Sequence, residues 1–428
     1  MNKYIGNLFK GDKAIWMVLF FLCIISIVEV FSALSILTFK SHDYMGPMLK
    51  HIFMIAAGVF VAVVTLNIPC RFFKIVTPFM LLLTVSMLLW VLLFGERTND
   101  GARWLGWGSF TFQPSELAKG TLVLATAQIL AAMQREDGSG AYPEAIKYVL
   151  VVAVPIVGLI GIENLSTAAL LFAVVLMMMF IGRIPMIQMG KLMGVLTILG
   201  VVFVSLVLTV GSMDKDDNDQ LATQTELVDR AVPVDQQEKK ETKDPSLIGK
   251  LTHRFGTWRH RLLDFFAPDE NVTPETYDLG KNFQVGHANI AIASSGIIGK
   301  GPGHSTERDL LPQAFADFIY AIIIEEMGIV GAIVVVFLYI ILLYRVARIA
   351  GRLENNFPAF LIMGLSLLLV LQASMNMMVA VGLMPVTGQP LPLISKGGTS
   401  TIINCIYIGV ILSVSRSAKR VNLQIEKA

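Results

Sequence analysis

The sequence contains few charged residues for its length. Asp, Glu, Lys and Arg make up 15% of the 428 residues, whereas soluble globular domains carry about 25%. Because soluble proteins keep these residues on a water-facing surface, this shortage argues against a soluble enzyme, and the 54% of hydrophobic residues argues against a disordered chain. The net charge of +2 gives no reason to expect nucleic acid as a partner.

Cysteine is scarce, and the common catalytic motifs are missing. The three cysteines, Cys23, Cys70 and Cys405, are too few for a disulfide framework and lie in or beside apolar runs, which favours buried free thiols. The sequence has no HExxH, Walker A, CxxC or GxSxG motif. These absences exclude zinc hydrolases, ATP-driven pumps, thiol redox enzymes and α/β-hydrolases. No cofactor is evident, and a requirement for a divalent cation is left open.

Long apolar blocks dominate the sequence. Their lengths are comparable to the roughly 20 residues that a helix needs to cross a bilayer. We predict an all-α polytopic membrane protein with about ten transmembrane helices in a single transmembrane domain, residues 1–428. The predicted spans are Ala14–Leu37, Pro47–Leu66, Ile75–Phe94, Pro114–Met133, Tyr148–Ile162, Leu165–Ile181, Met189–Gly211, Phe315–Tyr344, Phe357–Gly382 and Pro390–Val414. Only Glu163-Asn164 divides the fifth span from the sixth.

The distribution of Lys and Arg predicts the orientation. Both termini and the connections after the even-numbered spans are rich in these residues. The short connections on the other side hold only Lys40, Lys50, Arg97, Arg103 and Lys396. Because basic residues remain on the cytoplasmic side, both termini are expected in the cytoplasm.

One large loop, 212–314, is expected on the outer side between the seventh and eighth spans. Its first part, 212–245, holds ten acids and five bases and is predicted to be flexible. The part 247–263 alternates bases with apolar residues at helical spacing, which predicts an amphipathic helix on the membrane surface, in contact with anionic lipid or with a substrate. Gly286–Gly303 is too short to span and is expected to be re-entrant or interfacial.

Polar residues in the outer connections are the candidates for chemistry. Pro114 suits the first turn of a helix, and Glu116 and Lys119 can pair at i, i+3. The segment 296–303 is glycine-rich and offers backbone N–H groups that either cradle a phosphate beside Lys300 or form a simple turn. The prolines and glycines of 385–400 predict an irregular, re-entrant backbone.

Several polar residues inside the predicted spans also need partners. Gln372 and Asn376, at i, i+4, are expected to be hydrogen-bond partners between helices. Glu29 and Glu163 are interpreted first as intramembrane polar contacts, and the adjacent carboxylates Glu325 and Glu326 need pairing or hydration.

The outer motifs resemble those of the SEDS family (shape, elongation, division and sporulation). They are Arg103-Trp-Leu-Gly with Phe112-Gln-Pro-Ser-Glu-Leu-Ala-Lys119, then Gly299-Lys-Gly-Pro-Gly303 with Glu325-Glu-Met-Gly328, and finally Met384-Pro-Val-Thr-Gly388 with Leu391-Pro-Leu-Ile-Ser-Lys-Gly-Gly-Thr-Ser400. The matches follow the family's order. Phe9-Lys-Gly-Asp-Lys13 and Val30-Phe-Ser-Ala33 resemble the cell-division branch more than the elongation branch.

The resemblance implies a peptidoglycan glycosyltransferase that polymerises lipid II during septal cell-wall synthesis and releases polyprenyl diphosphate. A family Asp in the large loop is the proposed general base. Its counterpart lies in Tyr277-Asp-Leu-Gly-Lys-Asn-Phe-Gln284, which is one residue shorter than the family motif. Counting back from Gln284 in this shorter motif makes Asp278 the first candidate for the base, and Asp269 is the second.

The resemblance, together with the outer position of these charges, also gives candidate substrate-binding residues and partners. The binding candidates are Arg103, Gln113, Ser115, Glu116, Lys119, Arg254, Arg259, Gln284, Lys300, Glu325, Ser395 and Lys396. The expected partners are a class B penicillin-binding protein transpeptidase, other divisome membrane proteins and membrane lipid, in the bacterial inner membrane at the septum. The alternatives are a flippase for the lipid-linked precursor, an elongation-type polymerase, and a scaffold that recruits division proteins.

Overall fold

The computed structural model describes residues 10–33, 45–94, 96–98, 101–107, 110–229, 256, 258–259, 283–311 and 316–425. The chain forms two compact units, one of Met1–Met186 with Asp278–Ala428 and one of Ile187–Tyr277. The predicted surface helix lies outside the described residues except for Gly256, Trp258 and Arg259, which are helical. The predictions of a single domain and of a membrane-surface helix therefore stay predictions.

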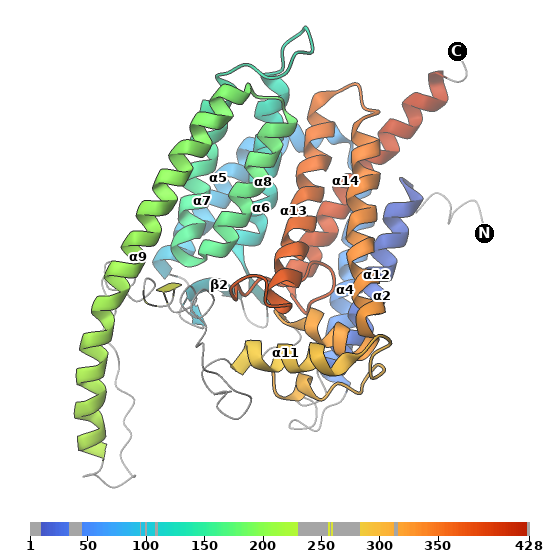
Figure 1. Ribbon diagram of the computed structural model, residues 1–428. Helices are drawn as coiled ribbons and strands as arrows, with labels where there is room; N and C mark the ends of the chain where they lie inside the picture. Colours follow the sequence, from blue (N-terminus) through green and yellow to red (C-terminus); the bar gives the residue numbers. More distant parts are fainter. Residues whose placement is uncertain are drawn as a thin grey trace. The chain divides into compact units, whose positions relative to one another are not determined.

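Ten helices of the described part coincide with the ten predicted spans (Figure 1). They are α2 (Lys13–Ala33), α4 (Gly46–Leu66), α5 (Cys70–Phe94), α6 (Pro114–Ala132), α7 (Ala145–Glu163), α8 (Leu165–Ile181), α9 (Met186–Asp229), α12 (Ile319–Ala350), α13 (Asn356–Ala380) and α14 (Thr399–Ile425). Eight are long and apolar enough to cross a membrane. The other two are α8, which has only 17 residues, and α6, which carries Glu116 and Lys119.

Polar residues fix several helix boundaries. Asn164 has an extended backbone, and its side chain accepts a hydrogen bond from the Thr167 amide at 3.2 Å. The junction Glu163-Asn164 therefore ends α7 and caps α8, as the sequence predicted. At the N-terminus, Asp12 Oδ1 accepts from the Ala14 amide at 2.9 Å, which caps α2.

Several predicted boundaries were wrong. The third helix begins at Cys70 rather than Ile75, and the eighth and tenth helices end at Ala350 and Ile425 rather than at Tyr344 and Val414. The seventh helix, α9, continues to Asp229, so 212–229 is helical in the segment that was expected to be loop. The eighth helix begins at Ile319 rather than Phe315, and Gly328 interrupts it with φ 70° and ψ −171°. The tenth begins at Thr399 rather than Pro390, because prolines at 390 and 392 lack amide donors and favour an extended backbone before them.

A small antiparallel sheet lies between α5 and α6 in the chain and was not predicted. It has the order β1-β2-β3, with β1 at Glu96–Thr98, β2 at Gly101–Trp107 and β3 at Phe110–Phe112. Leu105 pairs with Phe112 across β2 and β3. Two pairs of turn-forming residue types, Asn99-Asp100 and Gly108-Ser109, separate the strands in the sequence, and this was the available signal for hairpins.

Helix α13 is central to the first unit and packs against α6, α8, α12 and α14. Helix α14 also packs closely against α4, where a Cβ on Gly58 would lie 2.8 Å from Cys405 Sγ. Helix α2 packs against α12. The short helix α11 (Phe283–Ser295) lies across the end of this bundle, against α12 (Figure 1).

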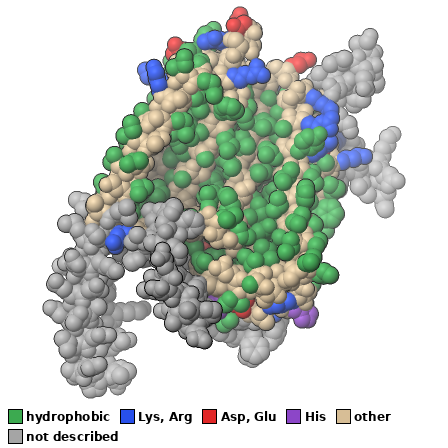
Figure 2. Space-filling model, viewed as in Figure 1, with side chains coloured by type: hydrophobic (Ala, Val, Ile, Leu, Met, Phe, Trp, Pro, Cys, Tyr) green, Lys and Arg blue, Asp and Glu red, His purple; other side chains and the backbone are tan. Residues whose placement is uncertain are grey.

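The two ends of the first unit differ in character. The N- and C-terminal helix ends and the basic connections after α4, α6 and α12 share one end, and β2, α11 and the segment 381–398 share the other (Figure 1). Hydrophobic side chains cover much of the helix surface between the ends (Figure 2). The end with β2, α11 and 381–398 is the one that the basic residues predict to face outward, and it is called the outer end below.

Candidate functional site

The structure does not describe every predicted site residue. Asp278, Asp269 and Arg254 lie outside the described residues, and Arg103 is described only as part of the backbone of β2. Arg259 belongs to the second unit. The other predicted residues lie on α6, α11, α12 and the loops of the outer end.

The first turns of α6 hold a buried ion pair. Lys119 is fully buried, and its Nζ donates to Glu116 Oε1 at 2.8 Å and to Gln372 Oε1 on α13 at 2.7 Å. The predicted i, i+3 pair is therefore confirmed, and Gln372 links two helices as expected. Within the described residues, Glu116 Oε2 has no hydrogen-bond partner. Gln113 occupies the N-cap position of α6 and Ser115 its first turn, and both are half-buried.

Gln372 extends this contact to the segment 381–398. Its Nε2 donates to the Pro390 carbonyl at 3.1 Å, and Asn376 Nδ2 donates to the Gln389 carbonyl at 2.7 Å. Gln389 in turn donates to Thr167 Oγ1 of α8 at 2.6 Å. The prediction of irregular backbone here is confirmed, and side chains of α13 donate to the carbonyls of Gln389 and Pro390 in place of the hydrogen bonds that a helix would supply.

Ser395 and its neighbours fix the last part of this segment. Ser395 is buried, its Oγ donates to the Ala316 carbonyl at 2.6 Å, and it accepts from the Leu391 amide at 2.8 Å. Tyr339 of α12 donates to the Pro392 carbonyl. Lys396 follows this fixed backbone and is half-buried.

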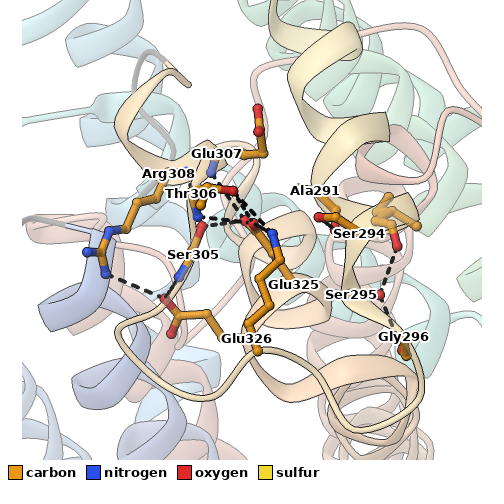
Figure 3. A network of polar contacts seen from close by, with 12 residues as sticks. Ala291, Ser294, Ser295, Gly296, Ser305, Thr306, Glu307, Arg308, Glu325 and Glu326 are labelled. Carbon is orange, nitrogen blue, oxygen red and sulfur yellow. Dashed lines mark hydrogen bonds and ion pairs between the residues drawn. The ribbon is translucent and has the colours of Figure 1, made fainter.

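The glycine-rich segment 299–308 wraps around two buried carboxylates (Figure 3). Glu325 accepts from Lys300 Nζ at 2.6 Å and from the amide and hydroxyl of Thr306 at 3.0 and 2.9 Å. The hydroxyl of Ser305 also donates to Glu325. Glu325 therefore has the partners that its position in an apolar helix requires.

Glu326 is held by the same segment and by α2. It accepts from the amides of Gly303 at 3.0 Å and Ser305 at 3.3 Å and from the hydroxyl of Ser32. Arg308 Nη1 lies 3.6 Å from Glu326 Oε1 and donates to Ser32 Oγ at 2.7 Å. The Ser305 and Arg308 contacts are visible in Figure 3.

The backbone donors of this segment are used by the protein itself. The amides of Lys300 and Gly301 donate to the carbonyls of Glu325 and Glu326 at 2.9 and 2.8 Å, and that of Gly303 binds the Glu326 carboxylate. Of the two alternatives predicted for this motif, these amides therefore favour a simple turn over a phosphate cradle. The substrate-binding roles of Lys300 and Glu325 stay predictions.

Glycine is required where this segment meets α12. A Cβ on Gly299 would lie 2.4 Å from the Gly328 amide nitrogen, and one on Gly328 would lie 2.5 Å from the Gly299 amide nitrogen. Both residues have positive φ, 84° and 70°. Two glycines at contact distance allow the turn to lie directly on the interruption in α12.

Sequence reasoning missed a second buried contact at the outer end. His287 of α11 lies 2.6 Å from Glu307 Oε2 through its Nδ1, and both side chains are buried. Gln284, a predicted binding residue, is half-buried one turn earlier on α11. The only available signal was the run of polar residues 304–309 directly after the glycine-rich motif.

Glu29 of α2 has a different environment from Glu326. It is fully buried, and neither carboxylate oxygen has a hydrogen-bond partner within the described residues. Within the described residues no hydrogen-bond donor supports the interpretation of Glu29 as a polar contact, which therefore stays a prediction.

This difference gives a prediction about stability. We expect Glu326→Gln to lower the free energy of unfolding by about 1.5–3 kcal/mol, because it removes a charged acceptor from several buried donors. Glu29→Gln is expected to change it little, because a neutral amide of the same size replaces a carboxyl group that accepts no hydrogen bond within the described residues. Thermal unfolding of the purified variants in detergent measures both. A lower melting temperature for Glu29→Gln than for Glu326→Gln would contradict the assignment.

The chain is similar to one family of known proteins over most of its length. The model of a family described as cell cycle protein, named for FtsW, RodA and SpoVE, matches residues 12–222 and 249–420. Peptidoglycan glycosyltransferase MrdB of Escherichia coli K12 is 28% identical over 404 residues, 93% of each chain. Probable peptidoglycan glycosyltransferase FtsW of Geobacter sp. M18 is 27% identical over 411 residues, 94% of this chain and 96% of the relative.

Solved structures share the fold. RodA of Thermus thermophilus superposes with a TM-score of 0.59 at 21% identity, over 96% of this chain and 98% of that chain. A chain of a peptidoglycan synthase complex, described as coordinating polymerization and crosslinking, superposes with a TM-score of 0.64 at 21% identity, over 95% and 98%. At this level of identity the two likenesses show the fold alone.

Proposed function

The chain belongs to the cell cycle protein family of FtsW, RodA and SpoVE, and from this premise we propose that it polymerises lipid II into glycan strands as a peptidoglycan glycosyltransferase. The main observation in support of this function is the family match over residues 12–222 and 249–420, which includes every motif of the outer end. The two relatives above are named peptidoglycan glycosyltransferase and probable peptidoglycan glycosyltransferase, and each matches this chain over nearly its full length. The protein is a multi-pass protein of the bacterial inner membrane.

In the proposed reaction, the 4-hydroxyl of one lipid-linked disaccharide attacks the anomeric carbon of the growing chain. Asp278 accepts the hydroxyl proton, a new glycosidic C–O bond forms, and the bond from the anomeric carbon to the diphosphate breaks. Polyprenyl diphosphate leaves with the bonding electrons. Asp278 precedes the first residue of α11 by five positions in the sequence, and the location of α11 at the outer end supports this role.

Cations at the outer end support the leaving group in this proposal. Lys300 and Lys396 belong to loops of that end, and a positive charge there stabilises the diphosphate as its charge develops. Lys119 is fully buried against Glu116 and Gln372. Its proposed contribution is therefore to fix α6 and α13 around the site or to bind substrate only after Glu116 moves.

Within the family, we propose that the protein belongs to the septal, FtsW-type branch and has a class B penicillin-binding protein as its transpeptidase partner. The motif Phe9-Lys-Gly-Asp-Lys13 supports this branch. The solved synthase complex, whose title joins polymerization to crosslinking, supports a partner of this kind. An elongation, RodA-type role is the alternative within the family.

The test is polymerisation of purified lipid II by the full chain with its transpeptidase partner, read as glycan strands on a gel. We expect strands from the wild-type chain, and their absence under conditions where the protein is folded and binds lipid II would contradict the proposal. A parallel assay in liposomes measures lipid II translocation. Translocation without polymerisation would favour the flippase, for which intramembrane charges and broken helices are also suited.

A further inference from the structure

Two strongly exposed isoleucines lie on a turn at the outer end. Gly296 begins this turn directly after α11 (Figure 3), and Ile297, Ile298 and Gly299 complete it. Ile297 and Ile298 are 71% and 82% exposed, and the two glycines have positive φ, 67° and 84°. Glycine therefore allows the chain to turn sharply with two apolar side chains at the tip. Neither isoleucine has a role in the proposed reaction.

Backbone hydrogen bonds hold this turn against the interruption in α12. A regular α-helix would pair the Val330 amide with the Glu326 carbonyl. Here the Val330 amide donates to the Ile297 carbonyl at 3.4 Å, and the Glu326 carbonyl accepts from the Gly301 amide at 2.8 Å. Both backbone groups are thus satisfied within the protein where Gly328 interrupts the helix, as backbone at membrane depth requires. The position of the turn on α12 is therefore fixed.

The apolar surface of α12 continues onto the turn. Helix α12 is long and apolar enough to span the membrane, and Ile329, Val330 and Ile333 are exposed just after its interruption. Ile329 and Ile333 share a face, because residues four apart lie one helical turn from each other. The bond between Val330 and Ile297 places the turn beside this surface. Because an exposed apolar face of a membrane span meets acyl chains rather than water, this continuity extends the lipid-facing surface to the turn.

The charge that follows the turn is paired. Lys300 Nζ donates to Glu325 Oε1 at 2.6 Å and to Thr306 Oγ1 at 3.1 Å. Contact between the turn and hydrocarbon therefore brings no isolated lysine charge into the lipid. Exposure to water, by contrast, would leave two large apolar side chains hydrated, which is unfavourable.

We propose that the turn 296–299 is a membrane anchor, in which Ile297 and Ile298 enter the outer leaflet and contact the acyl chains of its lipids. Helix α11 then lies at the membrane surface, and the anchor fixes the end of α11 that leads into the segment wrapped around Glu325 and Glu326. An interfacial position is one of the two forms that the sequence predicts for Gly286–Gly303. The anchor does not depend on the proposed reaction.

Fluorescence quenching of a bimane label tests where the turn lies. The label is attached to Ile298→Cys in the full chain in phosphatidylcholine nanodiscs, on a Cys70→Ser background in which the other native cysteines are buried. Phe337→Cys, on the exposed apolar surface of α12, is the lipid-side control. Ser139→Cys, in the exposed connection between α6 and α7, is the water-side control.

We expect a doxyl-labelled phosphatidylcholine to quench the label at Ile298→Cys to a similar extent as at Phe337→Cys. Iodide should quench it about fivefold less than at Ser139→Cys, because hydrocarbon excludes the ion. Strong quenching by iodide without quenching by the lipid would overturn the proposal, since the turn would then face water. Quenching by neither would also overturn it, in favour of a contact with protein.

Hydrogen exchange of α11 tests the anchoring. In the double variant Ile297→Ser/Ile298→Ser the amides of α11 are expected to exchange about tenfold faster in nanodiscs, because the loss of apolar contact with lipid makes local opening easier. Ile297→Leu/Ile298→Leu keeps the apolar surface and should exchange at the wild-type rate. Wild-type exchange in the folded serine variant would overturn the anchoring of α11. Neither measurement involves polymerisation, so a negative result would leave the proposed function in place.

Discussion

Asp278→Asn is expected to slow glycan polymerisation by about 10²–10⁴-fold while lipid II binding is retained. The asparagine side chain keeps the size of the aspartate but cannot accept the proton of the attacking hydroxyl, and general-base catalysis contributes a factor of this order. The measurement is the initial rate of strand formation by the purified chain with its transpeptidase partner, beside a lipid II binding isotherm.

Asp269→Asn is the matched control, since Asp269 lies in the same loop and is the second candidate for the base. It is expected to polymerise at close to the wild-type rate. If Asp269→Asn loses the activity and Asp278→Asn keeps it, the base is Asp269. If both polymerise normally, neither carboxylate is the base.

Lys119→Met is expected to lower the free energy of unfolding by about 3–5 kcal/mol. Lys119 is fully buried between Glu116 and Gln372, so its removal leaves a carboxylate without its counter-charge in the interior. The double variant Glu116→Gln/Lys119→Met removes both charges, and most of the lost stability should return.

The double variant separates the two roles that Lys119 can have. If the ion pair serves only to hold α6 against α13, the double variant should regain polymerisation together with its melting temperature. If Lys119 also binds substrate, it should regain the melting temperature but remain inactive. A double variant less stable than both single variants would contradict the pairing itself. The readouts are thermal unfolding and strand formation.

The sequence predicted those parts of the fold that depend on local information. Each of the ten predicted apolar blocks corresponds to a helix in the structure. Asn164 separates α7 from α8 as expected, because its side chain caps α8 by accepting a hydrogen bond from the amide only three residues later. The Glu116–Lys119 pair was predictable because i, i+3 neighbours on a helix are always close. The irregular backbone of 385–398 followed from its prolines and glycines.

The rest depends on contacts between residues far apart in the chain. Glu325 is bound by donors 18 to 25 residues earlier, so composition could not decide between a phosphate and a carboxylate as the anion in the glycine-rich turn. The bond from Ser26 to Ile394 joins residues 368 positions apart. The start of α14 at Thr399 was missed because the apolar residues before it are buried in a non-helical segment, which hydropathy cannot distinguish from a span.

The wrapping of Glu325 and Glu326 has a consequence for how the protein is made. Within the described residues, the side-chain carboxylates of both glutamates accept only from donors that precede them: Ser32, Lys300, Gly303, Ser305, Thr306, Glu307 and Arg308. Because a ribosome delivers the chain from its N-terminus, every partner has been translated before the glutamates emerge. The order of synthesis therefore allows α12 to enter the bilayer with its two acids already bound to their donors, so that neither need cross into lipid as an isolated charge.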